Sequence, residues 1–199
     1  MSSAGRVEGD DVLRLFLALR LPHEVLDALE CWSARELQHG RRVRREQLHI
    51  TLAFLGARPA GEVPRIVDAL RAAVARSAAF SLEPLRYRET GSVGMVVLAD
   101  PSGVAGRLTV DLHERLEECG SYRREARSWL PHVTVLRFRT RPRLRPPLPE
   151  LGVFAPSDAA AFLSRLHPAG ARYEVLESVP LCQSEKERAG DGSLEELGG

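Results

Sequence analysis

The chain has 199 residues, 44% of them hydrophobic, and a formal net charge of +1. This length and hydrophobic content can bury a core, so we expect one domain or two small lobes that share an interface. No apolar run approaches the roughly 18 residues of a membrane span, and the polar start of the chain lacks the apolar segment of a signal peptide. We therefore expect no membrane partner.

The three cysteines, Cys31, Cys119 and Cys182, are far apart and form no Cys-x-x-Cys motif. Their number and spacing argue against a disulfide framework or a zinc knuckle, and we expect a reduced, cytoplasmic protein. An acidic head (1–11) and an acidic tail (183–199) are expected to be disordered. They leave a mildly basic body, 12–182, which we expect to be a single domain of two lobes. A basic body suits an anionic ligand but is also common among other soluble enzymes.

Hydrophobic periodicity and turn residues predict alternating strands and helices along the body. In chain order these are a strand over 12–20, a helix over 24–39, a strand over 47–56, a helix over 61–78, strands over 80–87 and 93–99, a helix over 103–119, a strand over 131–139, and a hairpin of 159–167 and 171–181. Gly40 is expected to end the first helix, and 41–45 forms a basic connector. The Pro/Arg-rich segment 141–149 cannot be regular structure. The order predicts an α+β fold with some internal duplication.

Two predicted strands carry the same short pattern, His-x-Thr-x, within an apolar run. The first contains His49 and Thr51, and the second contains His132 and Thr134. Successive side chains of a strand point to opposite faces, so each His shares a face with its Thr, roughly 7 Å away. We interpret the two pairs as halves of one site. The alternative is that both histidines lie at the edge of the core and bond a neighbouring strand.

Two imidazoles suit acid–base phosphoryl transfer without a metal. The pKa of histidine lies near 6.5, so one ring can take a proton from water while the other gives a proton to the leaving oxygen. The two threonine hydroxyls can donate to the phosphate oxygens. Neutral hydroxyls stabilise charge weakly, so an arginine is expected to assist, and the nearest candidates are Arg127 and Arg137.

The paired motifs resemble those of the two-histidine (2H) phosphoesterase superfamily. Within it the chain is similar to the RNA 2′,3′-cyclic phosphodiesterases, historically called 2′-5′ RNA ligases (LigT-like). The similar segments are Arg-Leu-Phe-Leu-Ala-Leu at 14–19, Leu-His-Ile-Thr-Leu-Ala-Phe-Leu-Gly at 48–56, Pro-His-Val-Thr-Val-Leu-Arg at 131–137 and Arg-Tyr-Glu-Val-Leu at 172–176. The resemblance therefore covers about residues 12–181.

The resemblance implies a bilobal fold, in which two antiparallel sheets, each backed by helices, surround a central cleft as pseudo-twofold duplicated lobes. It also implies hydrolysis of 2′,3′-cyclic phosphate ends to 2′-phosphomonoesters, with no metal and no cofactor. Carried over by position, His49 is the proton donor and His132 the proton acceptor, although the sequence alone leaves that assignment open. Thr51 and Thr134 bind phosphate. Arg127 and Arg137, five residues either side of His132, match arginine positions common in the family.

The chain departs from the family at two positions that bear on RNA contacts. Arg42 stands where a Trp is common, which favours phosphate contact over base stacking. Trp129 stands where a Phe is common, and it either stacks on a base or packs in the core. Arg137 also has the opposite strand parity to His132, so it reaches the same phosphate only if the strand twists, bulges or ends there.

Other features allow more than one interpretation. The basic clusters 41–45 and 137–145 form either an RNA-tracking rim or a solvated surface. His113 is expected to face solvent on a helix. The function is expected to be a cyclic phosphodiesterase acting on RNA ends or small cyclic nucleotides, with a ligase in the reverse direction or a non-catalytic RNA-binding module as alternatives. We expect a monomer.

Overall fold

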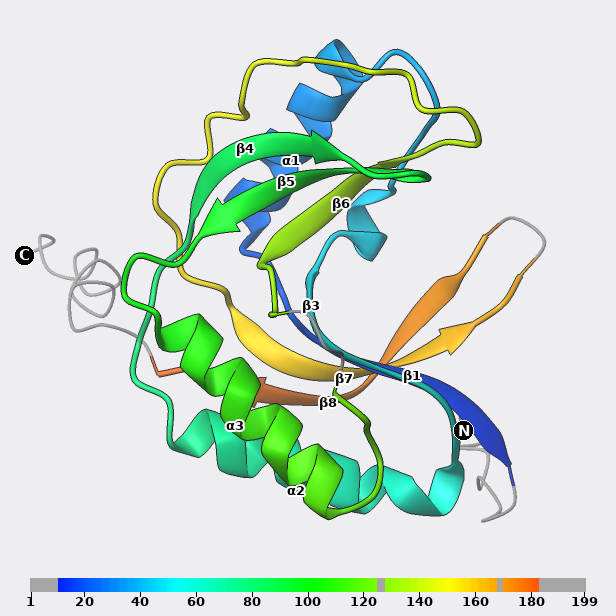
Figure 1. Cartoon of the computed structure of the whole chain (residues 1–199), viewed down its shortest axis with the longest axis vertical. Coiled ribbons are helices and arrows are strands. Elements are labelled where there is room, and N and C mark those ends of the chain that lie inside the picture. The colour runs from blue at the N-terminus through cyan, green and yellow to red at the C-terminus, as the bar shows by residue number, and fades with distance from the viewer. Residues whose placement is uncertain (1–10, 125–127, 168–169, 183–199) are drawn as a thin grey trace, which may run out of the picture.

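The computed structural model describes residues 11–124, 128–167 and 170–182. The predicted disordered head and tail lie outside these residues, apart from Asp11. The described elements, drawn in Figure 1, are β1 (Val12–Leu19), α1 (His23–Glu36), β2 (Arg41–Arg42), β3 (Ile50–Pro59), α2 (Val63–Ala75), β4 (Glu83–Glu89), β5 (Val93–Ala99), α3 (Val104–Glu118), β6 (His132–Arg137), β7 (Asp158–Arg165) and β8 (Arg172–Pro180), with short 3-10 turns at Arg45–Gln47 and Ala60–Glu62. None of the helices in the described part is long and apolar enough to cross a membrane.

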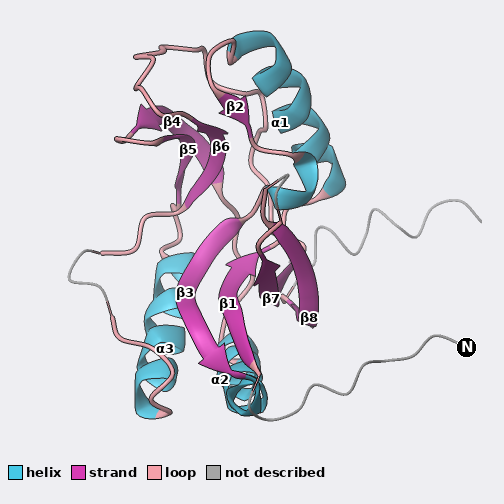
Figure 2. Ribbon diagram, turned by 90° about the vertical axis from the view of Figure 1, so that its right-hand side faces the viewer, coloured by secondary structure: helices cyan, strands magenta, loops and turns pink. Residues whose placement is uncertain are grey.

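The strands of the described residues form one eight-stranded antiparallel sheet, in the order β4-β5-β6-β3-β1-β7-β8 with β2 paired to β6. The helices α2 and α3 lie beside the half that contains β1, β3, β7 and β8, whereas α1 lies beside the half that contains β4, β5 and β6 (Figures 1 and 2). One residue pair, Ile50 with Val133, joins β3 to β6 and so connects the halves. The predicted α+β class, with antiparallel strands backed by helices, is confirmed.

The first strand is apolar on both faces, and each face packs against a different group of residues. Leu15, Leu17 and Leu19 belong to the main core, together with buried residues of α2 and α3. Phe16 and Ala18 point the other way and pack with residues of β7 and β8 in a smaller cluster. Burial on both faces explains why β1 shows only a weak polar alternation.

Two predicted boundaries differ from the structure near the first motif. The first helix ends at Glu36 rather than His39, and Gly40 instead lies in a bend directly before the short strand β2. Gly40 has φ +99°, and a Cβ there would lie 2.8 Å from the carbonyl oxygen of Arg137. Only glycine permits this close approach without strain, and it lets the predicted basic connector pair with β6.

The prediction that His113 faces solvent is wrong. The side chain is 9% exposed, and its Nε2 donates a hydrogen bond of 2.8 Å to the carbonyl oxygen of Leu52. Helix α3 packs against both α2 and β3, so its buried face is wider than the single leucine stripe that the periodicity indicated. Thr109, one turn earlier, is fully buried on the same side.

Candidate active site

The four motif side chains share one face of the sheet at the junction of its halves. His49 lies directly before β3 and Thr51 within it, while His132 and Thr134 lie in β6, and all four are half-buried. The residues between and beside them point the other way: Ile50 and Val133 are fully buried, and Leu48, Leu52 and Val135 are at most 8% exposed. The apolar residues therefore fix both strands on the core and leave the polar pairs on the opposite face.

The register of β3 and β6 crosses the two motifs. The strands run antiparallel with Ile50 opposite Val133. One residue to either side, this register places His49 across from Thr134 and Thr51 across from His132. Each imidazole thus has a hydroxyl beside it along its own strand and another across the strand pair. Such an arrangement can present two imidazoles and two hydroxyls to one small anion.

Both imidazoles make the same local hydrogen bond. The Nδ1 of His49 lies 2.7 Å from the carbonyl oxygen of Gln47, and the Nδ1 of His132 lies 2.8 Å from the carbonyl oxygen of Leu130. A carbonyl oxygen can only accept, so Nδ1 carries the proton in each ring. The Nε2 atom is therefore the one that takes up or releases a proton in both.

Among the residues that the structure describes, aromatic rings surround the imidazole of His49 but not that of His132. The ring of Phe16 lies 4.9 Å from that of His49, and those of Tyr173 and Phe162 lie 5.6 and 6.2 Å away. The pKa of His49 is lowered to about 4, mainly because the ring is buried. The hydrogen bond to Gln47 raises the pKa, and the charges of His132 and Arg137 lower it further. At neutral pH the ring is therefore uncharged in the free protein, with a lone pair on Nε2.

A bulge in β6 brings Arg137 to the same region. The pairing of β6 with β5 shifts between Thr134 and Leu136, and the strand ends at Arg137. Val135 and Leu136 are both buried, and the following Arg137 is exposed. The bulge thus reverses the strand parity that would otherwise point Arg137 away from His132. The effect of its charge on the His49 pKa agrees with this placement.

The other predicted arginines have different positions. Arg42 is exposed in β2 and pairs with Leu136, while its neighbour Arg41 is the cross-strand partner of Arg137. Cross-strand partners share a face, so Arg41, which sequence analysis did not single out, is the β2 arginine on the side of Arg137. The basic run at 41–45 was the only sequence signal for it. Arg127 lies outside the described residues.

Trp129 connects the two motifs. It is half-buried against the main core, and its indole Nε1 donates a hydrogen bond of 2.8 Å to the carbonyl oxygen of Thr51. Trp129, three positions before His132, is thus hydrogen-bonded to β3, the strand that follows His49. This geometry agrees with core packing of Trp129, one of the two interpretations of the sequence.

No local sequence pattern identifies the aromatic residues around His49 as part of the site. Phe16 belongs to β1, Phe162 to β7 and Tyr173 to β8, so they meet only in the folded sheet. Phe16 and Tyr173 do lie within segments that resemble the 2H phosphoesterases, and that resemblance was the one available signal. Within the part of the chain that the structure describes, no group of three His, Cys, Asp or Glu side chains could hold a metal ion.

The chain is similar to known proteins over most of its length. The chain belongs to the 2′-5′ RNA ligase superfamily, whose family model matches residues 22–167. It is 33% identical over 186 residues to an RNA 2′,3′-cyclic phosphodiesterase of Thermus thermophilus, spanning 85% of this chain and 90% of the relative. An RNA 2′,3′-cyclic phosphodiesterase of Geobacillus stearothermophilus is 26% identical over 190 residues, or 89% of this chain, and the match spans only 60% of its length.

A solved structure agrees with these sequence matches. The apo form of Escherichia coli LigT superimposes with a TM-score of 0.73 at 26% identity, covering 87% of this chain and all of LigT. The family predicted from the two motifs is therefore confirmed.

Proposed function

We propose that the chain hydrolyses 2′,3′-cyclic phosphate ends of RNA, or related cyclic nucleotides, to 2′-phosphomonoesters with no metal and no cofactor. The observation that supports this most directly is the crossed arrangement of two His/Thr pairs on one sheet face, with both rings fixed through Nδ1. Membership of the superfamily and relatives with the cyclic phosphodiesterase name support the same reaction.

In the proposed reaction each imidazole moves one proton through Nε2. His132 accepts a proton from water as the water oxygen attacks phosphorus. His49 donates a proton to O3′ as the P–O3′ bond breaks, which leaves a free 3′-hydroxyl and a 2′-phosphate. Thr51, Thr134 and Arg137 bind the non-bridging oxygens, whose charge must be stabilised in the transition state. The family pattern adds Arg127 to these phosphate ligands.

The donor role requires His49 to gain a proton when substrate binds, because its pKa of about 4 leaves it neutral at pH 7. The cyclic phosphodiester brings a negative charge to the ring, and an opposite charge within about 4–6 Å raises the pKa of an imidazole by roughly 1–3 units. We therefore propose that substrate and proton bind together. The expected rate profile is bell-shaped in pH, with the two limbs belonging to the coupled pair.

The decisive experiment is incubation of a 2′,3′-cyclic-phosphate oligonucleotide with wild type, His49→Ala, His132→Ala and His39→Ala in excess EDTA. His39 is exposed near the end of α1 and serves as the matched control. We expect a 2′-phosphate product from wild type and His39→Ala, and little from the other two. Equal turnover in all four would contradict the mechanism, and loss of wild-type activity in EDTA alone would reveal a metal requirement.

The alternatives predict other outcomes of the same assay. A non-catalytic RNA-binding module of this fold would bind the oligonucleotide without converting it, and the two intact His/Thr pairs argue against that outcome. A 2′-5′ RNA ligase would join ends in the reverse direction. The further expectations that the chain is monomeric and cytoplasmic, that the body 12–182 is one domain of two lobes, and that Arg42 and Trp129 contact RNA remain part of this proposal.

A further inference from the structure

The segment that follows β6 carries a series of exposed arginines. Arg139, Arg143 and Arg145 are exposed, while Phe138, directly before them, and Leu144, among them, are half-buried against the core. Among the described residues, none of these three guanidinium groups makes an ion pair or a hydrogen bond with another side chain. We call the segment 139–145 the arginine loop. The charges of Arg139, Arg143 and Arg145 are therefore presented to solvent, whereas Arg141 in the same loop pairs with Glu89.

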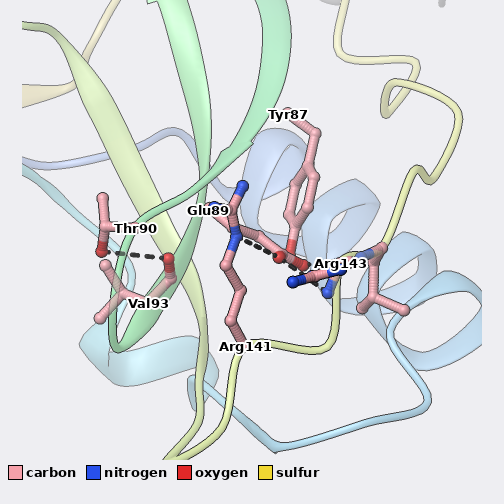
Figure 3. Close-up of polar contacts among 7 residues, drawn as sticks. Tyr87, Glu89, Thr90, Val93, Arg141 and Arg143 are labelled. Atoms are coloured by element: carbon pink, nitrogen blue, oxygen red, sulfur yellow. Dashed lines mark hydrogen bonds and ion pairs between the residues drawn. The ribbon is translucent and has the colours of Figure 1, made fainter.

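A buried carboxylate fixes the shape of the arginine loop. The Glu89 side chain is 2% exposed and accepts hydrogen bonds from the Nε of Arg141 at 3.1 Å and from the backbone N–H groups of Arg143 and Leu144, both at 2.9 Å (Figure 3). Arg143 has φ +60°, a conformation that costs a non-glycine residue energy. The two backbone bonds to Glu89 hold it there. The loop is therefore fixed although it has no regular structure.

The arginine loop continues directly from the proposed phosphate site. It begins two residues after Arg137, whose charge lowers the pKa of His49. The backbone N–H of Phe138, between Arg137 and the loop, donates a hydrogen bond to the carbonyl oxygen of Ser92, at the turn between β4 and β5. Glu89 lies at that same end of the sheet, since it pairs with Gly94, which in turn pairs with Leu136 beside Arg137. The anchored arginines and Arg137 thus gather at one end of β6.

We propose that the arginine loop binds the phosphates of the RNA strand that precedes the cyclic phosphate, so that polynucleotide ends are preferred over mononucleotides. This inference rests on the proposed function. A 2′,3′-cyclic phosphate terminates a 3′ end, so the strand leaves the site in one direction only. A mononucleotide has a single phosphate for the His/Thr pairs, and each further nucleotide adds one phosphate that only a surface outside the pairs can contact. Arginine is the residue best suited to bind it.

The test compares two double variants of equal charge change. Arg139→Gln/Arg145→Gln removes two loop charges and leaves the Glu89 bonds in place. Arg76→Gln/Arg107→Gln instead removes two exposed charges, one from the residue that caps the end of α2 and one from α3. For each, kcat/KM is measured on a 2′,3′-cyclic mononucleotide and on cyclic-phosphate oligonucleotides of two to six nucleotides, at several salt concentrations.

In wild type and in the α2/α3 control we expect kcat/KM to rise with oligonucleotide length. In the loop variant we expect the value on the longest oligonucleotide to fall roughly tenfold and the value on the mononucleotide to stay unchanged. The slope of log kcat/KM against log salt should become shallower by about 1.4, because each contact to a single strand contributes about 0.7. Equal length dependence in both double variants, or an equal loss on the mononucleotide, would overturn the proposal.

A binding measurement separates failure of this proposal from failure of the proposed reaction. Fluorescence anisotropy with a labelled 3′-phosphorylated hexanucleotide requires no turnover. Weaker binding by the loop variant than by the α2/α3 control would support the arginine loop as an RNA surface even if wild type hydrolysed neither substrate. Equal binding by the two variants would refute the surface while leaving the hydrolysis of cyclic mononucleotides intact.

Discussion

His49 and His132 have the same local geometry in different surroundings. Each donates from Nδ1 to the carbonyl two residues earlier, and each shares a face with its own threonine. His49 also contacts the rings of Phe16 and Tyr173, whereas within the described residues His132 contacts no aromatic ring. The local hydrogen bond of each motif determines that Nε2 exchanges the proton. The aromatic residues of the neighbouring strands bury the His49 ring and so lower its pKa. A duplicated motif can thus supply two unlike acid–base groups.

The largest effect on kcat is expected when either imidazole is removed. His49→Ala and His132→Ala should each lower kcat on a cyclic-phosphate substrate by about 10²–10⁴-fold, because each removes one proton transfer. The double variant should be little worse than either single variant, since the two groups act in one step. Single-turnover rates with all three proteins measure this.

Thermal unfolding of the same proteins is the control. A loss of activity counts as a loss of chemistry only in a variant that stays folded at the assay temperature. A loss of less than tenfold in either single variant would show that its imidazole transfers no proton in the slow step.

The second prediction concerns the pH dependence of stability that the surroundings of His49 produce. The pKa of His49 falls from its ordinary value of 6.5 to about 4 in the folded protein, so between these values the unfolded chain binds a proton that the folded chain does not. Wild-type stability should therefore fall as the pH drops from about 6.5 to 4, by up to about 3 kcal/mol from this group. His49→Gln should lose that part of the dependence.

Urea unfolding between pH 7.5 and 4.5 measures the effect, with His39→Gln as a control because its ring is exposed. Identical pH slopes in wild type and His49→Gln would mean that the aromatic residues do not hold the ring neutral.

Short-range patterns made much of this fold predictable from the sequence. Alternation within the two motif strands indicated that His49 and Thr51, like His132 and Thr134, share a face. Helical periodicity located α1, α2 and α3, with errors of up to three residues at their ends. These features depend on residues a few positions apart, where periodicity is informative.

Features that depend on strand pairing could not be predicted. Phe16 and Tyr173 meet His49 only through the register of β1, β7 and β8, and no local pattern encodes a register over such separations. The bulge that redirects Arg137 lies in a run of apolar residues that reads as an ordinary strand. The two-residue strand β2 is too short to show any periodicity.

A smaller effect is expected from the hydroxyls. The register places Thr51 and Thr134 across from the opposite histidines, so the two should contribute alike. Thr51→Val and Thr134→Val keep the β-branched shape and remove one hydrogen bond to phosphate, which corresponds to a decrease in kcat/KM of roughly tenfold each. Kinetics on a cyclic mononucleotide measure this without any contribution from the arginine loop. A loss confined to one threonine would indicate that only one half of the crossed arrangement holds the phosphate.

The smallest effect is expected from loss of the hydrogen bond between the Trp129 indole and the carbonyl oxygen of Thr51. Trp129 and His113 each donate to a β3 carbonyl at 2.8 Å, Trp129 to Thr51 and His113 to Leu52. Trp129→Phe and His113→Phe should each destabilise the protein by about 1–2 kcal/mol, because each leaves a carbonyl without that donor. Only Trp129 also belongs to the segment that leads into His132, so only Trp129→Phe should change the alignment of the two imidazoles. We expect a few-fold lower kcat for Trp129→Phe at unchanged KM, and unchanged kcat for His113→Phe below its unfolding temperature. An equal decrease in both would mean that β3 itself must be held on both sides, and that Trp129 has no separate role in aligning the histidines.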